Sequence, residues 1–122
     1  MLIGEVTNRT RGTLLADRCS IAITPFERIK GLLGTSELQD GCGMLIVPCN
    51  SIHTFFMRYS IDVAFLDGEM RIVHTMHSLP PWRVCIPVGV GAKMALELPP
   101  GKLAETNTAV GDMLEVKLLA LR

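Results

Sequence analysis

The sequence predicts a mainly β protein, a small antiparallel barrel or sandwich with one N-terminal α-helix over about residues 25–33. Three observations predict this class. Short segments of alternating apolar and polar residues recur along the chain, as half-buried strands require. Turns containing glycine or proline separate these segments, and one segment alone has both the start signal and the apolar spacing of a helix.

The N-terminal part is predicted to begin with a loosely ordered lead-in over residues 1–12. Two short strands should follow over residues 13–16 and 19–24, joined by a turn at Asp17-Arg18. We expect residues 1–122 to form a single domain, because a chain of this length can bury a core without disulfide bonds.

The helix is predicted from its first residues. Thr24 suits the N-cap, Pro25 suits the first helical position, and Glu27 completes a capping box. Gly34 suits the C-cap, where a positive φ is common. Four apolar residues at spacings of three and four should form one buried face: Phe26, Ile29, Leu32 and Leu33.

The rest of the chain is predicted to consist of strands. The segment 61–66 should place Asp62 on a face that is otherwise apolar, with Ala64 and Leu66. Asp67-Gly68 is a strong signal for a tight hairpin. The predicted strands cover residues 44–47, 53–58, 61–66, 69–76, 92–98 and 113–120.

Composition and charge exclude several classes of protein. Twelve basic residues balance twelve acidic ones, so nucleic acid is not an expected partner. No apolar run is long enough to span a membrane, and no signal peptide is visible, so we expect a cytoplasmic protein, or an exported one if a leader has been removed. The four cysteines are expected to be free thiols.

A series of motifs in a fixed order carries a family resemblance. The chain is similar to the Domain of Unknown Function 192 family from about Glu27 to Val116. The matching residues are Gly31-Leu32-Leu33, Gly43-Met44-Leu45, Ser51 to Arg58, Ile61-Asp62-Val63, Phe65-Leu66-Asp67, Pro81-Trp82-Arg83, Leu96-Glu97-Leu98, Gly101 and Gly111-Asp112.

The resemblance implies a small, mainly β fold and a prokaryotic protein, since members occur in bacteria and archaea, some with an exported leader. It implies no particular activity, because the family is uncharacterised. One residue departs from the family pattern: Ser60 stands where the bend after Arg58 often carries proline. This bend should therefore be more flexible here.

Polar residues among apolar ones in the central segment, about residues 49–67, indicate a candidate pocket. From this we expect a small-ligand or peptide-binding accessory protein. The alternatives are an enzyme of unknown reaction, with Asp62 and His53 as an acid–base pair, and a structural interaction module. The oligomeric state cannot be inferred. The candidate residues are His53, Thr54, Arg58, Asp62, Arg83 and Glu97.

These residues also have a structural interpretation. Asp62 could pair with Arg58 or Arg83 while His53 is merely hydrogen-bonded, because buried polar groups need partners whether or not they act. Alternation within a strand over 53–58 would place His53 and Arg58 on opposite faces. A common site would then have to form at a strand end or at the bend.

Three further candidate sites are a zinc site, a cysteine nucleophile and an apolar binding surface. Zinc could be held by Cys42, Cys49 and His53 with His74 or His77, but the paired ligand spacing of structural zinc is absent, so we predict no metal and no cofactor. Cys49 or Cys85 could be a nucleophile beside His53, although nothing indicates activation. A peptide or apolar ligand could bind any exposed part of one further set: Phe55, Phe56, Met57, Met76 and Trp82.

Overall fold

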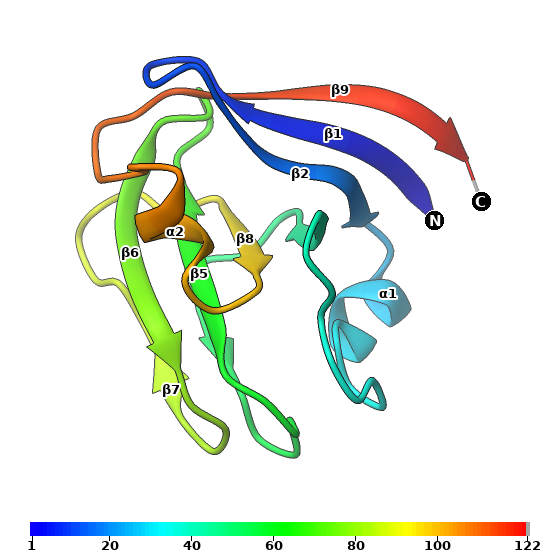
Figure 1. The fold of residues 1–122 in the computed structure, drawn as a ribbon. Coiled ribbons are helices and arrows are strands. Elements are labelled where there is room, and N and C mark those ends of the chain that lie inside the picture. The colour runs from blue at the N-terminus through cyan, green and yellow to red at the C-terminus, as the bar shows by residue number, and fades with distance from the viewer. Residues whose placement is uncertain (122) are drawn as a thin grey trace.

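The computed structural model describes residues 1–121 and shows a mainly β fold, as predicted. Seven strands form one mixed sheet, two short strands form a second sheet, and two short helices lie in the connections (Figure 1). The elements of the described residues are β1 (Leu2–Asn8), β2 (Thr13–Ala22), α1 (Pro25–Lys30), β3 (Cys42–Ile46), β4 (Ile52–His53), β5 (Ile61–Leu66), β6 (Ile72–Leu79), β7 (Val84–Cys85), β8 (Met94–Leu98), α2 (Lys102–Glu105) and β9 (Leu114–Leu121).

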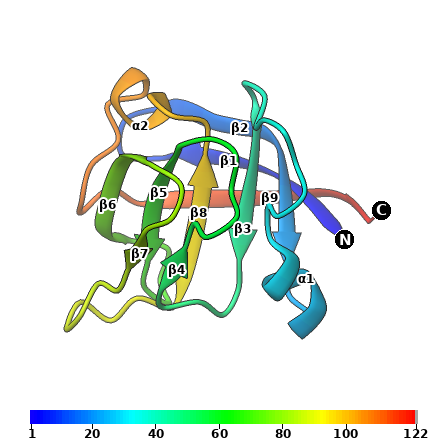
Figure 2. The same ribbon diagram turned by 90° about the horizontal axis from the view of Figure 1, so that it is seen from below.

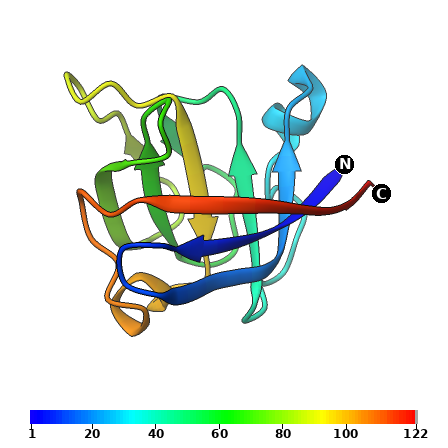
Figure 3. The same ribbon diagram turned by 90° about the horizontal axis from the view of Figure 1, so that it is seen from above.

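The large sheet has the order β6-β5-β8-β3-β2-β1-β9. Its neighbouring strands are antiparallel except β2 and β3, which are parallel. The sheet curls so that β1 and β9 cross over β5 and β8 (Figures 2 and 3). The edge strands β6 and β9 approach each other near an isolated bridge between Arg71 and Met113, but the sheet is not closed. The prediction of a barrel was therefore wrong.

Strand β5 lies between two apolar clusters and is buried on both faces. Ala64 and Leu66 join the cluster inside the curl, while Val63 and Phe65 join the cluster on the other face. This confirms the alternation predicted for residues 61–66, which places Asp62 on the face inside the curl. Because β8 pairs with β5, its side chains divide between the same two clusters, and Glu97 shares the outer face with Ala95.

Two predictions for the N-terminal part are corrected. Residues 2–8 are not a loose lead-in but strand β1, which pairs with β2 on one side and β9 on the other. Residues 13–22 form one continuous strand rather than two, because Asp17-Arg18 extends the strand past a bulge opposite β1. Pairing with strands that are distant in sequence fixes these residues in the sheet, and the local alternation of apolar and polar residues did not indicate this.

Helix α1 begins as predicted but ends early. The Thr24 capping box with Glu27 is present, whereas the C-cap is Gly31, at a φ of 46°, instead of Gly34. With only six residues the helix has no buried side chain, and Phe26 and Ile29 are both 76% exposed. Leu32, which follows the helix, is buried in the outer cluster. The helix was therefore predicted too long, and the predicted buried face was wrong for Phe26 and Ile29.

The segment 53–58 is not a strand. Strand β4 consists of Ile52 and His53 alone and pairs with β7 through Cys85 and Val84. The chain then turns, and Phe56 has a φ of 66°, which ends any strand alternation. Within residues 1–121, no helix is long and apolar enough to cross a membrane.

Candidate functional site

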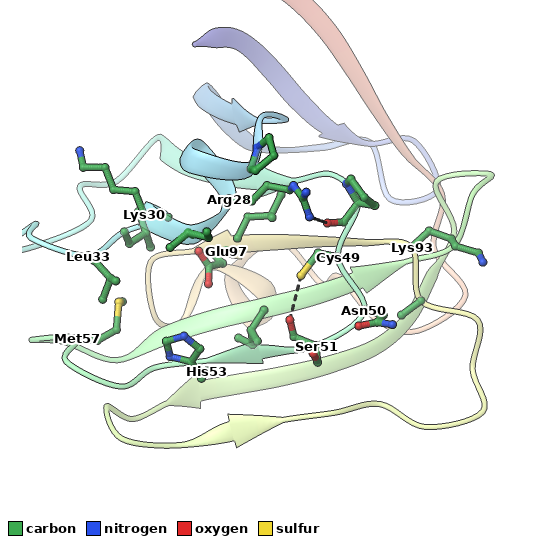
Figure 4. A pocket seen from close by; sticks show the side chains of 18 residues that line it. Arg28, Lys30, Leu33, Cys49, Asn50, Ser51, His53, Met57, Lys93 and Glu97 are labelled. Carbon is green, nitrogen blue, oxygen red and sulfur yellow. Dashed lines mark hydrogen bonds between the residues drawn. The ribbon is translucent and has the colours of Figure 1, made fainter.

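A cavity of about 740 Å³ opens beside α1, between that helix and the Pro48–His53 segment (Figure 4). Its walls are more apolar than polar, and the polar groups among them could orient a ligand. The apolar lining comprises Pro25, Ile29, Gly31, Leu32, Leu33, Ile46, Pro48, Ile52, Met57 and Ala92. The polar lining comprises Arg28, Lys30, Cys49, Asn50, Ser51, His53, Lys93 and Glu97.

Glu97 is the buried acid of this cavity. It lies in the middle of the large sheet on β8, pairs with Val63 and Met44, and is 5% exposed. Figure 4 shows its carboxyl group pointing into the space between α1 and His53. Within residues 1–121 neither carboxyl oxygen has a hydrogen-bond partner, and burial raises the pKa of Glu97 to about 7. The cavity therefore contains a carboxyl group that is free to bond to a ligand.

Arg28 supplies a second unsatisfied group to the wall. Its Nη1 donates to the carbonyl oxygen of Pro48 at 3.4 Å, which holds the side chain across the cavity rim. Its Nε is buried and is the one buried side-chain nitrogen or oxygen without a partner in the described residues. A buried N–H donor without an acceptor costs about 1–3 kcal/mol, so this position favours a ligand that supplies an acceptor.

The thiol of Cys49 is affected by the charges of both Glu97 and Arg28. Its Sγ donates to the carbonyl oxygen of Ser51 at 3.0 Å. Burial raises the pKa of the Cys49 thiol, the charge of Glu97 raises it further, and the charge of Arg28 lowers it. The thiol is thus held protonated and is not an activated nucleophile.

Asp62 lies away from this cavity and is fully buried. Its Oδ1 accepts from the backbone N–H of Ser78 at 2.8 Å, and its Oδ2 accepts from Gly101 at 3.1 Å and Leu103 at 2.9 Å. The last two donors belong to the first turn of α2, whose N-cap residue provides no side-chain acceptor. Asp62 therefore caps α2 from a neighbouring strand and has no exposed surface with which to meet a substrate.

Thr54 and the backbone of Arg83 form a second structural connection. Thr54 is fully buried, and its hydroxyl donates to the carbonyl oxygen of Pro80 at 2.6 Å and accepts from the N–H of Arg83 at 2.9 Å. The Thr54 N–H donates to the Arg83 carbonyl, and the Thr54 carbonyl accepts from Trp82. These bonds join the loop after β4 to the loop before β7. The side chain of Arg83 points out to solvent.

The six predicted site residues thus do not converge on one pocket. His53 and Glu97 line the cavity together, while Thr54 and Asp62 are buried elsewhere and Arg58 and Arg83 are exposed. His53 is itself exposed, and its Nδ1 accepts from the N–H of Phe55 at 3.2 Å. The structure offers no support for Asp62 and His53 as an acid–base pair, because every oxygen of Asp62 is already bonded within the fold.

The structure also bears on the proposed cysteine nucleophiles and the proposed zinc site. All four cysteines are free thiols, and Cys19 and Cys85 are buried. Burial raises the pKa of Cys85, which argues against its use as a nucleophile. Residues 1–121 contain no group of three His, Cys, Asp or Glu residues that could hold a metal ion.

Sequence reasoning missed Arg28 as a cavity residue, since a cation on a predicted helix is normally solvated. Gly31 limits α1 to six residues. No local pattern specifies how so short a helix lies against Pro48, and the place of Arg28 at the cavity depends on that contact.

Comparisons with known proteins identify the family and the fold of this chain but assign it no activity. The family model DUF192, described as uncharacterized ACR, matches residues 6–116. A UPF0127 protein of Thermococcus sibiricus is 37% identical over an alignment of 113 residues that covers 88% of this chain and 71% of that protein. A UPF0127 protein of Pyrococcus abyssi is 43% identical over 65 residues, 53% of this chain and about half (54%) of that protein.

Two solved structures share the fold. A protein of unknown function from Novosphingobium aromaticivorans superimposes with a TM-score of 0.78 at 24% identity, over 93% of this chain and 83% of that one. A Sinorhizobium meliloti protein, provisionally described as a transcription regulator, superimposes with a TM-score of 0.79 at 19% identity, over 94% and 92% of the two chains. At such identities the likeness shows the fold alone.

Proposed function

This chain belongs to the DUF192 family, and because that family carries no assigned activity we propose a function from the geometry of the cavity: the protein binds a small, largely apolar molecule through Glu97. The observation that carries the proposal is the Glu97 carboxyl group: the residue is only 5% exposed, its carboxyl faces the cavity, and it makes no hydrogen bond within residues 1–121. Burial raises the pKa of this group to about 7, and a ligand that donates to the carboxylate would stabilise its charged form.

The lining narrows the chemistry of the ligand. A volume of about 740 Å³ lies within the range of small-molecule sites, and the apolar walls favour an apolar body. Glu97 accepts hydrogen bonds in its ionised form, and Arg28 Nε donates one. The best match is an apolar molecule with a hydrogen-bond donor for Glu97 and an acceptor for Arg28, as in a primary amide.

A thermal-shift screen of apolar primary amides, alcohols and amines tests this proposal. A ligand present at about 100 times its Kd adds about 2.7 kcal/mol to the free energy of unfolding and should raise Tm by several degrees. Glu97→Met removes the acceptor and should lose most of this shift. Glu69→Met, which makes the same change at an exposed residue of the β5–β6 turn, should retain it.

Two results would count against binding. One is that no class of molecule raises the Tm of the wild-type protein. The other is that the molecules that do so stabilise Glu97→Met equally well, which would place them elsewhere on the surface.

A second candidate function, general acid–base catalysis by Glu97, is favoured by its pKa of about 7, since a catalytic acid or base works best near the ambient pH. The two candidates are separated by incubating each stabilising molecule with the protein and recovering it. A binding protein returns the molecule unchanged, whereas an enzyme converts it, and Glu97→Gln then stops the conversion.

A further inference from the structure

Aromatic side chains gather at the end of the molecule formed by the loop after β4 and the loop before β7. Phe56 is 72% exposed, Trp82 is 56% exposed and Phe55 is 38% exposed. Ring centroids lie 4.7 Å apart for Phe56 and Trp82, 6.0 Å for Phe55 and Trp82, and 5.1 Å for His53 and Phe55. These four rings, His53, Phe55, Phe56 and Trp82, are called the aromatic cluster below.

The fold holds the aromatic cluster in place from beneath. The five hydrogen bonds that join buried Thr54 to residues 80–83 fix both loops, and the β4–β7 pairing fixes their bases. Phe56 and Trp82 have φ values of 66° and 65°, a region that costs bulky residues about 1–2 kcal/mol. The hydrogen bonds beneath the loops thus hold two large aromatic residues in an unfavourable backbone conformation at an exposed end of the molecule.

The charge around the aromatic cluster has one sign. Arg58 and Arg83 are both exposed on the same two loops. No aspartate or glutamate occurs between residues 41 and 61 or between residues 70 and 96, although the whole chain is neutral. The end that carries the aromatic rings is therefore locally cationic, and its complement is an anionic surface.

We propose that the aromatic cluster is a site at which the protein attaches to the surface of an anionic lipid bilayer. Phenylalanine and tryptophan rings next to arginine side chains suit the headgroup boundary, where apolar rings enter and cations meet lipid phosphates. The two loops project together from one end of the molecule, which allows both to reach a flat surface (Figure 1). His53 also lines the cavity, but this proposal does not require the ligand proposed there.

Trp82 is the single tryptophan of the chain and gives a direct readout. The full-length protein is mixed with vesicles of phosphatidylcholine alone and with vesicles that contain roughly one third phosphatidylglycerol. We expect cosedimentation with the anionic vesicles and a blue shift of Trp82 emission, both weakened by high salt because the attraction is partly electrostatic.

Matched variants distinguish binding through the aromatic cluster from non-specific adsorption of the protein to vesicles. Phe56→Asn, which tolerates the positive φ, should lower the vesicle partition coefficient roughly tenfold, as expected when one aromatic ring no longer enters the boundary. Leu118→Ser removes a side chain that is 62% exposed on β9, at the opposite end, and should leave partition unchanged. The double change Arg58→Gln and Arg83→Gln should lower partition roughly tenfold and remove the salt dependence.

The proposal is overturned if the protein does not bind anionic vesicles, or if Phe56→Asn and wild type bind them equally. Polyglutamate is added in a parallel arm. Binding to this acidic peptide with a blue shift of Trp82, but not to vesicles, would assign the aromatic cluster to a protein partner instead. A stable dimer that is lost in Phe56→Asn would also overturn the proposal. If Phe56→Asn fails to fold, the arginine variants and the salt dependence decide.

Discussion

Asp62 and Glu97 are buried carboxyl groups on neighbouring strands, one position apart in register, and they face opposite sides of the sheet. Asp62 accepts hydrogen bonds from three backbone N–H groups, whereas Glu97 has no partner within residues 1–121 and faces a cavity. The comparison teaches that burial of an acid does not by itself indicate function. A carboxyl group whose bonding capacity is filled serves the fold, and one whose capacity is unfilled is available to a ligand.

Asp62→Ala should give the largest loss of stability. It leaves the N–H groups of Ser78, Gly101 and Leu103 without an acceptor, and each buried unsatisfied donor costs about 1–3 kcal/mol, so the loss should be about 3 kcal/mol or more. Urea denaturation measures it. The control Asp67→Ala also removes an acceptor for two backbone donors, but these are exposed to water and should cost much less. Equal losses would contradict the role of Asp62.

The pH dependence of stability should distinguish wild type from Glu97→Gln. The pKa of Glu97 is raised from 4.5 to about 7, so the folded state binds more protons than the unfolded state between these pH values. Stability therefore falls as pH rises through this window, by up to about 3 kcal/mol for a shift of this size. Glu97→Gln lacks this loss. Denaturation from pH 4 to 8 checks the difference, and parallel profiles for the two proteins would contradict it.

Glu97→Met should not lower stability, in contrast with Asp62→Ala. An apolar side chain of similar length removes a buried acid that is ionised at pH 8, and such replacements are neutral or stabilising by about 1–3 kcal/mol. Urea denaturation at that pH measures the change. A loss comparable with that of Asp62→Ala would mean that Glu97 makes structural bonds and would remove the basis of the comparison.

Reactivity of Cys49 should show the smallest effect. Burial raises the pKa of the Cys49 thiol and the charge of Glu97 raises it further, so Glu97→Gln should increase the thiolate fraction at pH 8 and with it the labelling rate. Iodoacetamide labelling followed by peptide mass spectrometry separates Cys49 from the other cysteines. An unchanged rate would mean that the two side chains are not coupled across the cavity.

Local sequence patterns predicted those parts of the fold that short-range physics determines. The faces of residues 61–66 and the start of α1 at Thr24 with its capping box were both correct. The end of α1 at residue 30 and the loss of strand structure after His53 were not predicted. The loss of strand structure after His53 depends on partners far along the chain, through the bonds between Thr54 and residues 80–83. The helix ends locally, at Gly31, which has a positive φ and donates its N–H to the Glu27 carbonyl.

The candidate site was predicted only in part, because contacts between distant parts of the chain determine which residues reach the cavity. Glu97 and His53 were among the six predicted residues and do line the cavity. Asp62 was also predicted as a site residue, because a carboxylate is unusual in an apolar strand. Its three hydrogen-bond donors lie 16 to 41 positions away in the chain, so the sequence did not reveal that both of its oxygens are already bonded. The role of Arg28 depends on where a six-residue helix sits against Pro48, which no local pattern specifies. Closure of the sheet failed as a prediction because curvature is a property of all seven strands.

The most direct test of the central claim is a carbon-13 NMR titration of the Glu97 carboxyl group in the ligand-free protein, assigned by comparison with Glu97→Gln. The account predicts a titration midpoint near pH 7, because the group is buried at the cavity without a hydrogen-bond donor within the described chain. A midpoint in the usual range near 4.5 would show that the carboxylate is solvated or bonded and would contradict the claim that Glu97 is held for a ligand.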